Sequence, residues 1–142
     1  MDRLPESVVR LAEAATDWAQ KRPDILALAL VGSHARGAAR EDSDVDLVLI
    51  SSKPHKYLAD TGWTAEFGEV ERNQTEDYSL LTSMRTWYKD GLEVEYGITS
   101  PAWAALPLDE GTRQVAADGM VVLFERGSIL SRIKRSILQR DS

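Results

Sequence analysis

The sequence predicts a single α+β domain over residues 1–142, in which a mixed, partly antiparallel sheet carries helices packed mainly on one side. A seven-residue apolar run, Ile25–Val31, is typical of a strand buried on both faces. Residues 80–88 and 92–99 are rich in strand formers and flank a Lys-Asp-Gly turn, which indicates an antiparallel hairpin. Helical periodicity at both ends of the chain adds helices to this sheet, so the class is α+β or mixed α/β.

The first half of the chain alternates helix and strand. Residues 5–20 predict a helix that covers the sheet, because Pro5 suits a first turn and apolar residues then recur at helical spacing. After the strand at Ile25–Val31, residues 33–36 predict a short helix closed by Gly37. A polar loop over residues 38–43 then leads into a strand at residues 44–50, which begins acidic and turns apolar.

The second half is less regular. Residues 51–74 receive no assigned element, since prolines and glycines interrupt any period. Beyond the hairpin we expect one helical turn at residues 101–106 and a short strand at residues 120–124. A last helix, capped by Gly127 and Ser128, is expected to end near Gln139.

Composition excludes several classes of protein. The chain has no cysteine and two histidines, so a metal ion would be held by oxygen ligands. No apolar run is long enough to span a bilayer, and the first residues lack the layout of a signal peptide, so we expect a cytoplasmic protein without membrane contact. A net charge of -6 opposes the positive field that long nucleic acid requires, which makes long nucleic acid a poor substrate.

The segment Gly-Ser-His-Ala-Arg-Gly at residues 32–37 follows a strand and opens a helix, where free N–H groups and the helix dipole attract phosphate. Gly32 allows close approach, the Ser33 hydroxyl adds a donor, and Arg36 offers a planar fork to phosphate oxygens. Taken alone, the segment also fits an ordinary strand-to-helix turn with Ser33 as the N-cap. His34 is expected to face solvent.

Asp44 and Asp46 are two residues apart on a predicted strand, so their side chains share one face, with Cα atoms about 6 to 7 Å apart. Two like charges on an otherwise apolar strand raise each other's pKa and favour a divalent cation such as Mg²⁺. The alternative is a solvated strand start with no ligand.

A third carboxylate is expected from the hairpin, because two metal ions need a shared cage of oxygen ligands. In residues 92–98 the apolar side chains take one face, which leaves Glu93 and Glu95 together on the other. Each glutamate by itself also fits an amphipathic strand whose acids lie in water.

Together, Gly-Ser-His-Ala-Arg-Gly at 32–37 and Asp-Val-Asp-Leu at 44–47 resemble the signature of the polymerase-beta-type nucleotidyltransferase superfamily, and most of all its minimal and aminoglycoside-modifying members. The resemblance implies a nucleotidyltransferase-type fold in which Gly32 and Ser33 hold the triphosphate, assisted by Arg36. It also implies that Asp44 and Asp46 bind two metal ions, and that Asp44 is one of the nucleotide-binding residues. The third acid of the family lies between apolar neighbours, which fits Glu95 better than Glu93.

The resemblance implies an enzyme that transfers a nucleoside monophosphate, with ATP as the expected donor, to a hydroxyl of a small molecule or protein and releases pyrophosphate. Glu95, or after it Glu93, could also accept the proton of the acceptor, although the metal alone could suffice. Only one helix is expected after Met120, where many relatives carry a large C-terminal helical domain, which leaves open a homodimer or a helical protein partner. The alternatives are an antitoxin-like module of a toxin–antitoxin pair and a domain that binds nucleotide without turnover.

Overall fold

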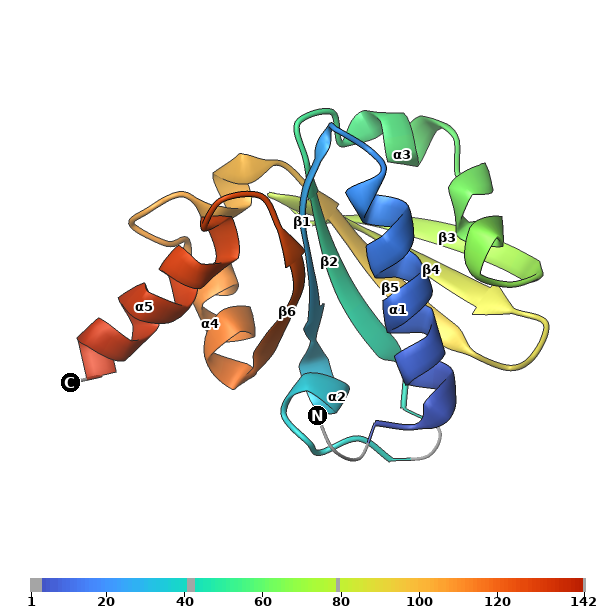
Figure 1. Ribbon diagram of the computed structural model, residues 1–142, viewed down its shortest axis with the longest axis horizontal. Coiled ribbons are helices and arrows are strands. Elements are labelled where there is room, and N and C mark those ends of the chain that lie inside the picture. Colours follow the sequence, from blue (N-terminus) through green and yellow to red (C-terminus); the bar gives the residue numbers. More distant parts are fainter. Residues whose placement is uncertain (1–3, 41–42, 79, 142) are drawn as a thin grey trace.

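A computed structural model describes residues 4–40, 43–78 and 80–141, which build one six-stranded sheet with helices on it (Figure 1). The strand order across the sheet is β3-β4-β5-β2-β1-β6. In chain order the elements are α1 (Glu6–Gln20), β1 (Ile25–Val31), α2 (Gly32–Ala35), β2 (Val45–Ser51), α3 (His55–Ala59), η1 (Gly62–Phe67), β3 (Val70–Tyr78), β4 (Leu81–Tyr88), β5 (Glu93–Thr99), η2 (Pro101–Ala104), α4 (Glu110–Asp118), β6 (Met120–Glu125) and α5 (Ile129–Asp141).

The sheet is mixed, as the sequence predicts. β2 and β5 pair in parallel, whereas β1 pairs antiparallel with both β2 and β6, and β4 pairs antiparallel with both β3 and β5. In the parallel pair Asp46 lies opposite Glu95, and on its other side Asp46 lies opposite Val31 of β1. At the centre of the sheet, β2 therefore lies between β1, which precedes Gly32, and β5, which carries the second group of acids.

One face of the sheet is covered by α1, α3 and η1. In Figure 1 the α1 ribbon crosses this face in front of the central strands. Its core combines aliphatic side chains of β1 and β2 with a group of aromatic rings. Those rings belong to Trp18, Tyr57, Trp63, Phe67 and Tyr96.

The opposite face is covered in part by η2, α4 and α5, which contact β1, β2 and β6. Alternate residues of β1 and β2, such as Ala29, Val48 and Ile50, are apolar on this side too and form a second core with Trp103 and Leu130. The α+β class is thus confirmed, but helices lie on both faces rather than mainly on one. The physical reason is that central strands that are apolar on both sides need cover on both sides.

Most predicted elements are present with small shifts at their ends. Gly91 turns the hairpin with a φ of 99°, the second strand begins at Val45 rather than Asp44, and the last helix continues to Asp141. Residues 41 and 42 of the predicted polar loop lie outside the described residues. The segment without an assigned element contains α3, η1 and the start of β3, and α4 was also not predicted.

None of the helices within the described ranges is both long enough and apolar enough to cross a membrane.

Candidate active site

Strand alternation brings the predicted carboxylates to the face that α1 leaves uncovered. Val45, Leu47 and Leu49 of β2 point into the first core, so Asp46 points to the opposite face. On β5, the same alternation places Glu93 and Glu95 on that face. Because the register pairs Asp46 with Glu95, the structure brings these two acids side by side at the centre of the sheet.

Arg85 of β4 connects this acidic group, and the sequence reasoning did not identify it. One guanidinium nitrogen donates to Asp44 and, at 3.2 Å, to Glu93, while the other donates to Glu95 at 2.9 Å. The hydrogen bond to Asp44, followed by the charges of Glu95 and Asp44, raises the pKa of Arg85. The signal was the predicted hairpin, since the register of β4 and β5 places Arg85 directly opposite Glu95.

The two candidate third acids differ in how firmly they are held. The Ser83 hydroxyl donates to one Glu95 oxygen at 2.6 Å, and Arg85 donates to the other. Glu93 bonds to Arg85 alone among the described residues. Two donors from β4 thus orient Glu95 next to Asp46, whereas Glu93 is the first residue of β5.

Asp46 is the acid with the most perturbed protonation equilibrium. Burial, followed by the negative charges of Glu95 and Asp44, raises the pKa of Asp46 to about 6, and the cations Arg85 and Arg36 offset part of this effect. A carboxyl group in such surroundings is stabilised by a neighbouring cation or by the uptake of a proton. The raised pKa belongs to Asp46, a residue to which the sequence prediction gave no role in proton transfer.

Gly32, the first residue after β1, contacts Asp46 directly. Its φ of +73° lies in the left-handed region. A Cβ at this position would collide with the Asp46 carboxylate, so a side chain is excluded for two independent reasons. The predicted phosphate loop and the predicted metal-binding strand thus meet at these two residues.

The remainder of the loop places Ser33 half-buried in α2 and Arg36 exposed just beyond it. Arg36 lies near enough to Asp46 to lower its pKa. His34 differs from expectation, because it is buried, with 6% of its surface exposed, rather than solvent-facing. Its Nε2 lies 3.4 Å from the Ser43 carbonyl oxygen, so His34 packs between the loop and the residue that precedes Asp44.

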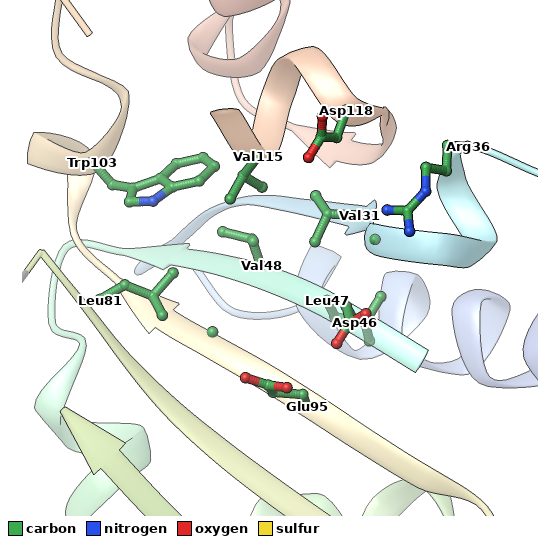
Figure 2. Close-up of a pocket in the computed structure, with 12 residues that line it drawn as sticks. Val31, Arg36, Asp46, Leu47, Val48, Leu81, Glu95, Trp103, Val115 and Asp118 are labelled. Carbon is green, nitrogen blue, oxygen red and sulfur yellow. The ribbon is translucent and has the colours of Figure 1, made fainter. Parts of the chain in front are cut away.

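A pocket of about 240 Å³ opens between these groups (Figure 2). Gly32, Arg36, Asp46 and Glu95 line it, together with apolar residues of β2, β4, η2 and α4. Ser33 and Asp44 are not among its lining residues. The structure therefore gathers four of the predicted residues at one cavity and leaves the other two beside it.

The donor set fits a hard divalent cation in type, because carboxylate oxygens are the ligands that Mg²⁺ prefers. Within the described ranges, however, no three acidic or histidine side chains gather closely enough to hold one ion. Arg85 forms ion pairs with carboxylate oxygens of Asp44, Glu93 and Glu95. The residues fit a cation that competes with this guanidinium for the same oxygens.

Comparisons with known proteins bear on the family and on the fold. The sequence pattern of the nucleotidyltransferase domain family matches residues 11–99, which include every predicted site residue. The fold is similar to the crystal structure of an aminoglycoside 6-adenyltransferase from Bacillus subtilis, with a TM-score of 0.54 and 13% sequence identity. This similarity covers 71% of the chain but 37% of the adenyltransferase chain. No curated protein matches the sequence.

Proposed function

Because the chain belongs to the nucleotidyltransferase domain family, as residues 11–99 show, we propose that it transfers a nucleoside monophosphate from an NTP to an acceptor hydroxyl. The donor is ATP, and residues 1–142 act as one domain. The observation that carries the proposal is the contact between Gly32 and the carboxylate of Asp46, beside Glu95. A loop suited to phosphate and an acidic pair suited to cations share one pocket.

The residues proposed to hold the nucleotide are Gly32, Ser33, Arg36 and Asp44. Backbone N–H groups at the start of a helix have no partner within the helix and point at a bound anion. The Arg36 guanidinium supplies charge and two parallel donors for phosphate oxygens. These groups fix the position of the triphosphate.

Asp44, Asp46 and Glu95 are proposed to hold Mg²⁺, with two ions as the expected number. When bound, Mg²⁺ neutralises the negative charge that develops on the phosphate oxygens and lowers the pKa of the attacking hydroxyl. The role of the chain is to present the oxygens. Ser83 and Arg85 orient Glu95 for this task.

In the proposed reaction the acceptor oxygen attacks the α-phosphorus of the NTP and forms a new phosphorus–oxygen bond. The bond between the α-phosphorus and the bridging oxygen breaks, and pyrophosphate leaves with the electron pair. The acceptor proton passes to a carboxylate of the acidic group or to water. Protein groups therefore act by position and charge.

Calorimetry tests this function directly. ATP and, separately, the other NTPs are titrated into the wild type and into the Asp44→Asn/Asp46→Asn double variant, each with Mg²⁺ and with EDTA. Binding to the wild type that needs Mg²⁺ and is lost in the double variant supports the proposal. If neither protein binds any NTP, the transferase proposal is wrong and a partner-binding module, such as an antitoxin, becomes the better hypothesis.

A further inference from the structure

The pocket has two chemically different ends. Figure 2 shows Asp46, Asp118 and Arg36 towards one end, Glu95 near the middle, and Trp103, Leu81 and Val115 towards the other end. The apolar end is formed by β2, β4, η2 and α4, which contribute Val48, Leu81, Trp103 and Val115. The proposed transfer uses the charged end and assigns no task to the apolar end.

Gly97 shapes the apolar end. It lies on β5 two residues after Glu95, on the same side of the sheet. A Cβ at this position would lie 2.8 Å from Leu81 Cδ1. Because residue 97 has no side chain, Leu81 can lie over β5 and form one wall of the cavity.

The walls of this end suit an apolar group better than a nucleobase. The Val48, Leu81 and Val115 side chains carry no hydrogen-bonding group, and Trp103 offers a single N–H donor. The amino group and most ring nitrogens of a base would therefore lose water without gaining partners there. Each unpaired polar group buried in this way costs about 1 to 3 kcal/mol. An apolar ring in the same place gains free energy from burial.

The cavity volume sets the size of the occupant. At about 240 Å³ it lies below the roughly 300–1,000 Å³ of pockets that enclose a whole drug-sized ligand. The occupant is therefore a compact molecule or one part of a larger molecule. The rest of such a molecule lies at the charged end, where Asp46 and Glu95 line the cavity.

We propose that the apolar end of this pocket binds the acceptor, and that the acceptor is an alcohol whose body is an apolar ring. The ring packs against Trp103, Leu81 and Val115, and the hydroxyl lies at the end lined by Asp46 and Glu95. This inference rests on the proposed function, because it names the substrate class that the same site uses.

The test is an NMR titration of the complete chain with Mg²⁺ and α,β-methylene-ATP, a donor that cannot transfer. Benzyl alcohol is the ring-bearing probe, glycerol is the alcohol without a ring, and adenine, titrated in the absence of the analogue, is the base probe. The indole N–H resonance of Trp103 reports on the apolar end. Saturable shifts with benzyl alcohol, and none with glycerol or adenine, are the expected result.

A pair of variants on α4 locates the site. Val115 is half-buried in the pocket wall and Ala117 is exposed on the same helix. Val115→Phe fills the cavity and should weaken benzyl alcohol binding by about tenfold, whereas Ala117→Phe should leave it unchanged. Binding of the ATP analogue should be equal in both variants.

The outcomes separate the two proposals. If the ATP analogue binds but benzyl alcohol leaves the Trp103 resonance unmoved, the acceptor assignment is wrong and the proposed function stands. If adenine shifts that resonance, or if Val115→Phe weakens binding of the analogue, the pocket binds the base and the acceptor assignment is wrong. If the analogue fails to bind the wild type, the proposed function itself fails.

Discussion

The two faces of the sheet use the same strands for different purposes. On the face under α1, the Trp18 and Trp63 rings stack with centroids 5.1 Å apart, and Tyr96 meets Trp63 edge-on. On the other face, the neighbours of Tyr96 on β5 are Glu95 and Gly97, which line the pocket. Alternation along a strand thus separates residues that stabilise the fold from residues placed for chemistry.

The open face is itself divided. Where η2, α4 and α5 contact the sheet, its residues are apolar, and beyond that cover lie Arg85 and the acids. Like charges gathered on a surface reduce stability unless a cation compensates them. We therefore expect substitutions on the first face to change stability and substitutions among the acids to change activity.

The largest expected effect is on activity and comes from Asp46→Asn. This change should lower nucleotidyl transfer by about a thousandfold, because it removes an anionic oxygen beside Glu95 from the site that holds the cation. The free energy of unfolding should not fall, since a like charge is removed. Transfer assays and urea unfolding measure the two quantities. Wild-type turnover in this variant would remove Asp46 from the mechanism.

A pair of tryptophan variants compares the two faces directly. Trp18→Ala empties a site on the closed face that is 8% exposed and should lower the free energy of unfolding by about 3 to 5 kcal/mol. Trp87→Ala removes a half-buried ring, over which the Arg72 guanidinium lies at 3.9 Å, and should cost about 1 kcal/mol. Urea denaturation measures both losses. Equal losses would contradict the division of the faces.

Two glycines with the same backbone conformation separate strain from collision. Gly32 and Gly37 both have a φ of 73°, but only a Cβ at Gly32 would collide with Asp46, and none of the described atoms lies near one at Gly37. Both alanine variants should lose about 1 to 2 kcal/mol of stability. Gly32→Ala should also lose about a hundredfold in transfer rate, because Asp46 is displaced. A similar rate loss in Gly37→Ala would assign the effect to strain.

The smallest expected effect is a pH dependence of the metal-free protein. The pKa of Asp46 is raised to about 6 in the folded chain, against an ordinary value of 3.8. The folded state therefore keeps a proton that the unfolded state releases, so this carboxyl makes the free energy of unfolding fall as pH rises from about 4 to about 6. After allowance for partial exposure, the fall is about 1 to 2 kcal/mol.

Arg85→Gln sharpens this test, because Arg85 lowers the pKa of Asp46. In this variant the fall should continue above pH 6, whereas Asp46→Asn should abolish it. Arg72→Gln is the matched control, since Arg72 lies over Trp87 rather than among the acids. Urea unfolding in EDTA from pH 4 to pH 7 measures all four proteins. Parallel curves for the wild type and Asp46→Asn would contradict the raised pKa.

Sequence patterns predicted the elements whose residues alternate or repeat strongly. The apolar run of β1 and the Lys-Asp-Gly turn between β4 and β5 are local signals, and both elements are present. β3 was not predicted, because its sequence from Val70 to Tyr78 is almost entirely polar and its structure depends on pairing with β4. Propensity carries little information for an edge strand of this kind.

The candidate site was predicted in its parts but not in its connections. The positions of Gly32, Asp46 and Glu95 followed from motif and alternation, and the structure places them together. Arg85 was missed, although the predicted hairpin already placed a cation opposite the acids. The apolar end of the pocket could not be predicted, since Trp103 and Val115 reach it through η2 and α4, whose packing no local pattern specifies.

The polar composition of β3 has a consequence for aggregation. An edge strand presents unpaired backbone groups that can template another chain. In β3 the exposed side chains include Glu71, Arg72, Glu76 and Asp77. A second copy added in parallel and in register would place like charges directly beside one another, which is destabilising. At the β3 edge of the sheet, the strand that is hardest to recognise from sequence is therefore the one that opposes the addition of a further strand.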